Sequence, residues 1–459
     1  MSRDYAEFLA SKAIRAPERG LTRTPELASH LFPFQAHCVE HALRCGSAGN
    51  FLDTGLGKTE VQLEWAQHAL EATNGRALIL TPLAVAGQFQ RRAERWGYES
   101  RVIREQSDAG TGINICNYDR IEKLDPSAFG AVSLDEASIL KSFSGKTARA
   151  LIDTFRDHRF RLAATATPAP NDHMELGNYA DFLSVMAPNE MLSRFFINDT
   201  STASQQWRLK GHAVNAFWQW VASWARAAER PSDLGDSDDG FILPPFKVFR
   251  HRARDSNIEN ALADLFGTVT MSATTLHDVK RQTIEARAEV AAALVAAEPS
   301  EPWIVWVDTD YESAAMKRVL PDTIEVRGSQ PADEKEEKLT AFALGKESRI
   351  IGKPSMMFGL DWSQCARQIF VGRSFSYETW YQAVRRSWRF GQKREVHVHI
   401  VVAEGEGEIG RVIDRKSNDH LIMKRAMRDA MKNASAGEAR MAAYTPNHQV
   451  SLPSWISAA

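Results

Sequence analysis

A glycine-rich segment holds the residues with the clearest potential for chemistry. The segment FLDTGLGKTEVQLEWAQHAL places Gly55, Gly57, Lys58 and Thr59 between an apolar run and a helical pattern. Glycines let a backbone wrap closely round phosphate oxygens, so that amide hydrogens and a helix N-terminus face the negative charge. Lys58 is expected to neutralise terminal phosphates and Thr59 to complete the coordination of Mg²⁺. Leu52 stands where the general pattern has its first glycine, so a chance match stays open for this loop alone.

Two adjacent carboxylates end a later apolar run, AVSLDEAS. Asp135 at a strand end can hold Mg²⁺, usually through water, and Glu136 can orient and deprotonate an attacking water. A surface Asp-Glu pair is the alternative, but its place after an apolar run and downstream of a phosphate loop favours a site. Thr165 and Thr167 end another run, and we expect their hydroxyls to bond these carboxylates and couple the site to its surroundings.

The elements that must position these residues follow a repeating pattern. Short β-branched apolar runs recur between helical stretches, and this alternation predicts parallel sheets covered by helices on both faces. The runs lie at 76–82, 112–118, 131–137 and 161–168, and then at 303–308, 323–328, 349–354, 367–372 and 395–404. The sequence therefore predicts two α/β domains in tandem.

Composition shifts suggest where these domains begin and end. The stretch PSDLGDSDDG is rich in Asp, Ser and Gly and is typical of a solvated linker. The predicted units are a first domain at 1–230 with a helical insertion at about 173–230, a linker at 231–240, a second domain at 241–435 and a tail at 436–459. The aromatic residues of AFWQWVASWARAAER have helical spacing, which favours packing over a base-stacking platform.

Overall composition excludes several classes of protein. With 459 residues, 44% hydrophobic and 25% charged, the chain matches ordinary globular proteins and is neither collagen-like nor disordered. Four scattered cysteines are too few for a disulfide framework. No apolar run approaches the roughly 18 residues of a membrane span, and the N-terminus lacks an apolar signal core. We expect a cytoplasmic protein without a membrane partner.

One segment of the second half carries a family resemblance. YQAVRRSWRFGQ at 381–392 resembles the sixth motif of superfamily 2 helicases, and within them the Swi/Snf type of double-stranded DNA translocase. The order of elements is similar from about residue 31 to residue 400. The resemblance implies two RecA-like domains that bind ATP and Mg²⁺, with Arg386 and Arg389 reaching the γ-phosphate and Arg389 as the finger. A basic solvated helix is the alternative for this segment.

Further motifs extend the resemblance. Phe34 and Gln35 look like an adenine-recognising motif, and MMFGLDW looks like a fifth motif that contains Gly359. Ser138 replaces a His and Asp361 replaces an Asn of the family pattern. The residues implied to contact nucleic acid are Thr81, Gln88, Asn117, Tyr118, Lys141 and Lys353.

The charge that could attract nucleic acid is local. The chain has a formal net charge of −2, but the stretch from Arg367 to Arg394 holds seven Lys or Arg against one acid, a balance of +6. Such a face binds phosphate backbones without reading sequence. Part of this stretch is already assigned to ATP, so the surplus for DNA or RNA is smaller.

These observations favour an ATP-dependent translocase on double-stranded DNA. A strand-separating DNA or RNA helicase, an ATP-gated nucleic-acid recruitment module and a small-molecule kinase remain as alternatives. The second α/β domain with its arginines argues against the kinase. The whole resembles compact forms found in bacteria and their phages, and because no reader domain is recognisable, a nuclease or methyltransferase partner is a further hypothesis.

Overall fold

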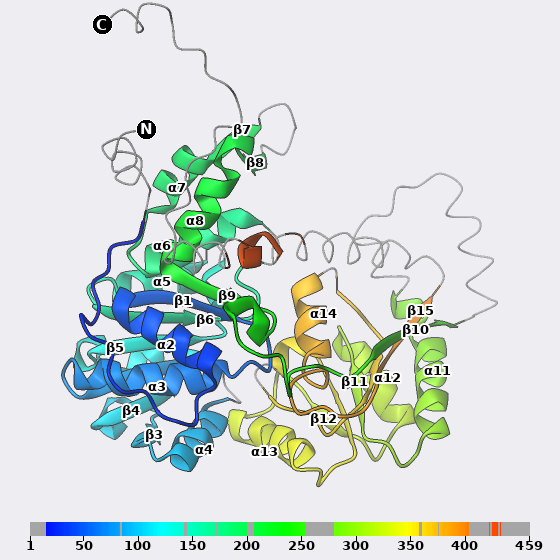
Figure 1. Cartoon of the computed structure of the whole chain (residues 1–459). Coiled ribbons are helices and arrows are strands. Elements are labelled where there is room, and N and C mark those ends of the chain that lie inside the picture. Colours follow the sequence, from blue (N-terminus) through cyan, green and yellow to red (C-terminus); the bar gives the residue numbers. More distant parts are fainter. Residues whose placement is uncertain are drawn as a thin grey trace, which may run out of the picture.

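The computed structural model describes most of the chain. The described residues are 15–82, 85–141, 145–169, 172–199, 206–253, 280–357, 360–374 and 376–403, with 422, 425–429 and 432. Within these ranges two α/β units stand next to each other, each built round a parallel sheet (Figure 1). This confirms the predicted fold class of two tandem RecA-like domains. The predicted tail at 436–459 lies outside the described residues, as does most of 411–435.

The first domain contains a seven-stranded sheet in the order β3-β4-β2-β5-β6-β1-β9. Every pair of neighbouring strands in it is parallel. Its strands are β1 Ser47–Leu52, β2 Arg76–Thr81, β3 Ser100–Val102, β4 Gly112–Asn117, β5 Ala131–Asp135, β6 Phe160–Ala164 and β9 Ala225–Ala228. The flanking helices are α2 Pro33–Cys45, α3 Lys58–Glu71, α4 Ala86–Trp96 and α5 Lys146–Thr154.

Two apolar clusters cover the faces of this sheet. One joins the strands to α2, α3 and α4, and the other joins them to α5 and to the helices of the insertion. Strands buried on both faces read as continuous apolar runs rather than alternating ones, as β2 and β5 do. The central strands β5, β6 and β1 are neighbours, so the segments that follow their carboxyl ends meet at one edge of the sheet.

The predicted helical insertion contains strands as well as helices. It comprises α6 Leu176–Phe182, α7 Pro188–Phe195, the antiparallel strands β7 Phe196–Asp199 and β8 Gln206–Leu209, and α8 Val214–Trp224. The aromatic residues of α8 are largely buried, which agrees with packing. The last strand of the predicted insertion, β9, pairs with β1 and belongs to the main sheet. Its sequence ARAA favours a helix, and the sheet overrides this preference.

The second domain has a six-stranded sheet in the order β10-β15-β14-β11-β13-β12. Its strands are β10 Phe246–Ala253, β11 Trp303–Trp306, β12 Ile324–Val326, β13 Arg349–Gly352, β14 Arg367–Phe370 and β15 Val396–Ala403. Its helices are α11 Ile284–Ala297, α12 Asp310–Val319, α13 Ala332–Ala343 and α14 Tyr377–Val384. Figure 1 shows α13 and α14 on the side of this domain that faces the first domain.

The chain crosses between the sheets along a segment that includes the predicted linker. Residues Pro231–Leu234 form a 3₁₀ turn, within which Pro231 and Asp233 are buried. The Asp233 carboxylate accepts the backbone N–H groups of Glu229 and Arg230 at 2.8 and 3.1 Å. The first part of this segment therefore packs on the first domain, although its composition suggests a solvated linker. No helix within the described ranges is long and apolar enough to cross a bilayer.

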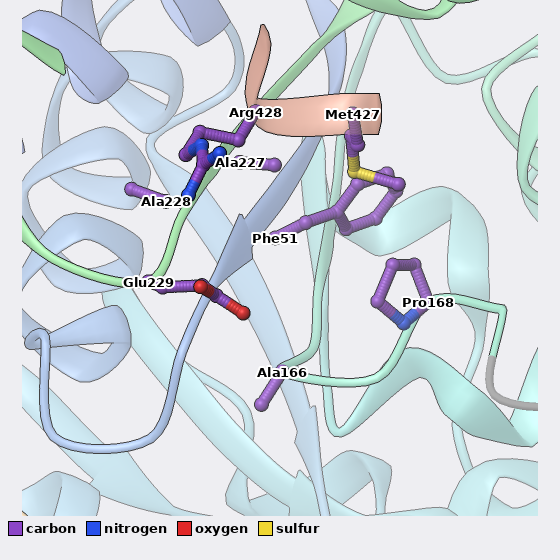
Figure 2. A pocket seen from close by; sticks show the side chains of 8 residues that line it. All are labelled: Phe51, Ala166, Pro168, Ala227, Ala228, Glu229, Met427 and Arg428. Carbon is purple, nitrogen blue, oxygen red and sulfur yellow. The ribbon is translucent and has the colours of Figure 1, made fainter. Parts of the chain in front are cut away.

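A short C-terminal helical segment, the described residues 425–429, returns to the first domain. Figure 2 shows Met427 beside the Phe51 ring, with Pro168 on the other side of the same small cavity. Met427 is 2% exposed and belongs to an apolar cluster of the first domain. The Arg428 guanidinium lies 4.0 Å from the Asp233 carboxylate. The described segment 425–429 thus packs against the first domain next to Phe51 of β1.

Candidate functional site

The predicted phosphate loop connects β1 to α3 and requires glycine at two positions. Gly55 and Gly57 have φ angles of +93° and +79°, in the left-handed region. A Cβ atom on Gly57 would lie 2.1 Å from Nε2 of Gln35, and one on Gly55 would lie 2.7 Å from the backbone nitrogen of Phe390. Helix α3 begins at Lys58, so its free N–H groups lie at the end of this loop. The loop therefore has the geometry of an anion cradle.

Lys58, the first residue of α3, is half-buried next to the loop. Its ammonium group donates hydrogen bonds to the backbone carbonyls of Leu52 and Asp53 at 3.1 and 3.5 Å. Burial lowers its pKa, and the nearby carboxylates of Glu136 and Asp135 oppose this effect. An incoming phosphate would offer this ammonium a full negative charge in place of two carbonyl dipoles.

Asp135 and Glu136 end β5 next to the loop. Asp135 accepts a hydrogen bond from Nε2 of Gln62 at 2.9 Å, and its backbone carbonyl accepts one from the Tyr118 hydroxyl at 2.7 Å. Burial raises the pKa of Asp135, and the neighbouring carboxylate of Glu136 raises it further. Glu136 has a φ of 49°, which is uncommon for a residue with a side chain and typical of strained functional positions.

One carboxylate oxygen of Glu136 lacks a protein partner. Its Oε2 is buried and has no hydrogen-bond partner among the described residues. A buried acceptor in this state is costly, so this oxygen is suited to accept a hydrogen bond from a water or to face a metal ion. The oxygen donors of Thr59 and Asp135 lie along the same cavity. This donor set suits Mg²⁺, which prefers carboxylates, hydroxyls, waters and phosphate oxygens.

The cavity next to the loop has a volume of about 340 Å³ and is shared by both domains. We call it the loop cavity. Its lining includes Gly55, Gly57, Lys58, Thr59, Asp135, Glu136, Arg386 and Arg389. The residues predicted from sequence to act on a triphosphate therefore gather round one space, although they come from opposite halves of the chain.

The two arginines reach this cavity from the segment after α14. Arg386 and Arg389 both donate to the carbonyl of Leu360, at 3.4 and 3.0 Å, and Nε of Arg389 lies 3.6 Å from Asp361. Burial lowers the pKa of Arg386 to about 10, and it lowers the pKa of Arg389 as well. Both remain protonated at neutral pH, so they deliver positive charge to the cavity.

Of the two residues predicted to recognise adenine, Gln35 lines the loop cavity and Phe34 does not. Phe34 is 1% exposed and its ring packs in the apolar cluster beneath α2, whereas Phe32 lines the loop cavity. Gln35 donates to the carbonyl of Leu56 at 3.0 Å and accepts the N–H of Phe32 at 3.0 Å. The Gln35 amide thus braces the phosphate loop in this structure.

Four aromatic rings that the sequence did not single out also line the loop cavity. Phe241 stacks on Phe390 with ring centroids 4.7 Å apart, and His30 stacks on Trp96 at 3.9 Å. All four residues line the loop cavity. Flat apolar walls of this kind suit a nucleobase. Only their proximity in space reveals them, because they are scattered along the sequence.

Of the two predicted coupling threonines, Thr167 contacts the second domain. Thr165 and Thr167 are fully buried, and the N–H of Thr167 donates to Oγ1 of Thr165 at 3.2 Å. We expected these hydroxyls to bond Asp135 and Glu136. The Thr167 hydroxyl instead donates to Glu378 at 3.4 Å and accepts from Nε2 of Gln382 at 3.4 Å. The side-chain contacts of Thr167 therefore run across the interdomain boundary.

A second cavity, of about 520 Å³, also lies between the domains. We call it the cleft cavity. Thr81, Tyr118 and Lys141, three of the predicted nucleic-acid contacts, line it together with Glu136. The Glu136 side chain therefore borders both cavities. Lys141 forms an ion pair with Glu378 of α14.

The other predicted nucleic-acid contacts are dispersed. Gln88 lines the loop cavity rather than the cleft cavity, and Oδ1 of Asn117 accepts a hydrogen bond from Thr81 at 3.5 Å. Lys353 pairs with Asp310 at 2.8 Å. Gly359, predicted to contact ATP, lies outside the described residues.

The basic stretch of the second half does not form a free basic face. Several of its guanidinium groups are paired with acids elsewhere in the chain, and these pairs are Arg367–Glu298, Arg385–Asp53, Arg389–Asp361 and Arg394–Glu301. Counting charges within one stretch of sequence overestimates the surplus of positive charge, because acids that are distant in sequence are left out of the count.

Helix α14 adds contacts to the phosphate loop that sequence reasoning missed. The Tyr381 hydroxyl donates to Asp53 at 2.6 Å, and Arg385 donates to the carbonyl of Thr54 at 2.6 Å while its guanidinium lies 3.3 Å from Asp53. The only sequence signal is the helical spacing of these residues with Gln382. That spacing is too common to identify a contact by itself.

Comparisons with known proteins give structural likenesses but no sequence match. No protein-family profile matches the chain, and no curated protein matches it. Among solved structures, the chain is similar to the SWI2/SNF2 ATPase core of Sulfolobus solfataricus in complex with double-stranded DNA. The identity is 16%, the match covers 92% of this chain and 98% of the other, and the TM-score is 0.40.

Proposed function

We propose that this protein hydrolyses ATP between its two domains and couples the reaction to movement along double-stranded DNA. One observation carries the proposal: Lys58 and Glu136 of the first domain and Arg389 of the second line a single cavity. Neither domain alone holds a complete hydrolytic set. Turnover therefore depends on how the domains are placed relative to each other.

The residues of the loop cavity have complementary roles toward ATP. The loop amides and Lys58 bind the β- and γ-phosphates, and Glu136 orients the attacking water and accepts its proton. Thr59 and Asp135 would hold Mg²⁺, which neutralises charge on the phosphate oxygens. Arg386 and Arg389 stabilise the charge that develops on the transferred phosphoryl group.

Movement along the nucleic acid would follow because the loop cavity and the cleft cavity both lie between the same two domains. When ATP draws the arginines toward the phosphate loop, the cleft cavity must change as well, because the same two domains form its walls. If each domain holds a different phosphate of one strand, a cycle of closure and opening moves the nucleic acid by a step. Thr81, Tyr118 and Lys141 are the candidates for contacts on the first domain.

Duplex DNA is the proposed track because of the motif resemblance to double-stranded DNA translocases. A strand-separating helicase needs a wedge element, and the sequence provides no recognisable one. An ATP-gated recruitment module has little use for Glu136 and Arg389 together, since binding alone does not require hydrolysis.

Steady-state ATP hydrolysis tests the proposal. The protein is assayed without nucleic acid and with duplex DNA, single-stranded DNA or RNA, at low and moderate salt, with Lys58→Ala as the blank. Stimulation by duplex DNA is the expected result. Stimulation mainly by single strands or RNA would favour the helicase, and a rate that no nucleic acid changes would refute the motor.

Glu136→Gln separates the motor from the recruitment module. The amide cannot accept a proton, so we expect hydrolysis to fall by about 10²-fold or more while ATP binding persists. Triplex displacement by the protein should be lost in parallel. A variant that no longer hydrolyses ATP but still displaces the triplex would contradict a motor.

A further inference from the structure

Glu378 occupies a position between the two cavities. It lies in the first turn of α14, where the Ser376 hydroxyl accepts the N–H of Thr379 and so fixes the start of the helix. Glu378 is 8% exposed, although it belongs to the second domain and faces the first. A carboxylate at such a boundary is costly unless it is paired.

Both oxygens of this carboxylate contact the first domain. One forms the ion pair with Lys141, and the other accepts the hydroxyl hydrogen of Thr167 at 3.4 Å. Gln382, one turn further along α14, donates to the same Thr167 oxygen at 3.4 Å. Glu378 therefore links Lys141 to the strand end that carries Thr165.

The lining of the cleft cavity is acidic in this arrangement. Its ionisable lining residues are Asp119, Glu136, Glu336 and Glu378 against Lys141 and Lys335. Lys141 is the cation on the first-domain wall, and its side chain is 36% exposed although it is paired. The Glu378 carboxylate therefore occupies the position next to the Lys141 ammonium where an anionic phosphate oxygen could bind.

We propose that Glu378 is an internal competitor of the DNA backbone, which holds Lys141 until a phosphodiester group of duplex DNA displaces it. This inference rests on the proposed function. Displacement frees the carboxylate that contacts Thr167. Glu378 is thus a positioning residue that connects the occupancy of the cleft cavity to the turn that follows β6.

A short route leads from this turn to the hydrolytic site. Thr165 directly follows Ala164, and Ala164 is the register partner of Asp135 across β5 and β6. The Thr167 N–H is bonded to the Thr165 hydroxyl. A shift of Thr167 on release of Glu378 would therefore act on the backbone next to Asp135 and Glu136.

Duplex binding by Glu378→Gln tests the competition directly. The nucleotide-free full chain is titrated onto a fluorescent DNA duplex, and anisotropy gives the dissociation constant. Removing the competitor should tighten binding by about fivefold, the scale of a partly exposed ion pair. In a Lys141→Ala background, the same substitution should change the constant by less than twofold.

Glu336→Gln is the matched control for charge. Glu336 lines the same cavity, so its neutralisation changes the local potential by the same amount without touching Lys141. Any tightening by Glu336→Gln should persist in the Lys141→Ala background. Lys141→Ala alone should lower the slope of log affinity against log salt by about one. Thermal unfolding checks that each variant folds.

The outcomes separate the inference from the proposed function. Equal affinity of wild type and Glu378→Gln, or equal tightening with and without Lys141, overturns the competition. A salt slope that Lys141→Ala leaves unchanged also overturns it, independently of the Glu378 variant. If wild-type protein binds duplex but its ATPase ignores DNA, the proposed motor fails while the competition is still decided by affinity. If wild type does not bind duplex at all, both fail.

Discussion

Opposite charges round the phosphate loop stabilise one another while no phosphate is bound. Burial disfavours the charged forms of Lys58 and Asp135, as the lowered pKa of Lys58 and the raised pKa of Asp135 indicate. Their mutual attraction is only partial, because Glu136 keeps an unpartnered oxygen. A nucleotide with its metal ion would complete these pairings and so stabilise the folded state.

A histidine in the second domain gives a pH dependence whose sign can be worked out. Burial, together with the adjacent His251 and His397, lowers the pKa of His399 to about 4, while Glu298 opposes the shift. His399 Nδ1 and His251 Nε2 are 2.9 Å apart, and the pKa of His251 is lowered as well. Between about pH 6.5 and 4, the unfolded chain binds a proton at position 399 that the folded chain does not.

Stability should therefore fall as the pH falls through this window, by at most about 1.4 kcal/mol per pH unit for one proton. Thermal unfolding between pH 8 and 4 measures the effect. His399→Gln should lose part of the slope, whereas His212→Gln, at an exposed position, should retain all of it. Equal slopes in wild type and His399→Gln would show that this group is not responsible.

Part of the site could be predicted from residue types alone. Lys58 and Glu136 follow the carboxyl ends of β1 and β5, which flank β6, and the carboxyl ends of parallel strands lie at one edge of the sheet. The choice between Phe32 and Phe34 could not be made this way, because it depends on which face of α2 packs against α3. The pairing of Asp53 with Arg385 was equally inaccessible, since the residues lie in different domains.

At the scale of elements, α14 connects the two domains. Tyr381 and the C-cap residue Arg385 contact the phosphate loop, while Glu378 and Gln382 contact Thr167. Residues three and four positions apart lie on one face of a helix, so a helix of eight residues can serve both partners at once. A rotation or shift of α14 would alter both sets of contacts together.

The ion pair between Arg385 and Asp53 should be a major part of this connection. Both side chains are at most 10% exposed, so removing one partner leaves a buried charge without its counterion. Arg385→Met and Asp53→Asn should each lower stability by about 3 kcal/mol, and the double variant should lose clearly less than the sum. Unfolding by denaturant, followed through the tryptophans, measures the three differences.

Arg318→Met provides the comparison, because its partner Glu285 is 59% exposed and the pair lies within the second domain. Its loss should change stability by less than about 1 kcal/mol. Strictly additive losses at Arg385 and Asp53 would mean that the two side chains do not depend on each other.

Whether a strand can be predicted from the sequence depends on whether it lies inside the sheet or at its edge. The buried strands β2, β5 and β14 are predicted because both of their faces are covered and their sequences are accordingly apolar. The outer strands β9 and β10 are missed, since one is alanine-rich and the other is largely exposed and basic. Their place is set by pairing with β1 and β15 rather than by their own sequence.

At the scale of the whole molecule, the chain joins its two domains in more than one place. The interface of α14 lies in the cleft, and the segment 425–429 packs behind β1 after the chain has left the second sheet. The contact of residues 425–429 with the first domain, here called the return contact, cannot be predicted from sequence. A short basic stretch with one methionine does not indicate which surface it packs against. The first domain is therefore held by the second domain and by the segment that follows it.

Met427 should control this return contact. Its side chain is 2% exposed beside Phe51 and Pro168, and a carboxylate there would be buried against apolar side chains (Figure 2). Met427→Glu should therefore release the segment, and trypsin should cleave after Arg425 and Arg428 at least about tenfold faster, because cleavage requires local opening. Mass spectrometry of timed digests measures the two cuts.

Ile422→Glu is the control, because Ile422 is 63% exposed and its substitution with the same residue leaves the contact intact. Both variants carry the same added charge close to the cleavage sites, so a difference between them reports docking rather than trypsin preference. ATP with Mg²⁺ should slow cleavage of the wild type further if closure of the cleft tightens the first domain round β1. Equal cleavage of wild type and Met427→Glu would mean that the segment is not held at this site in solution.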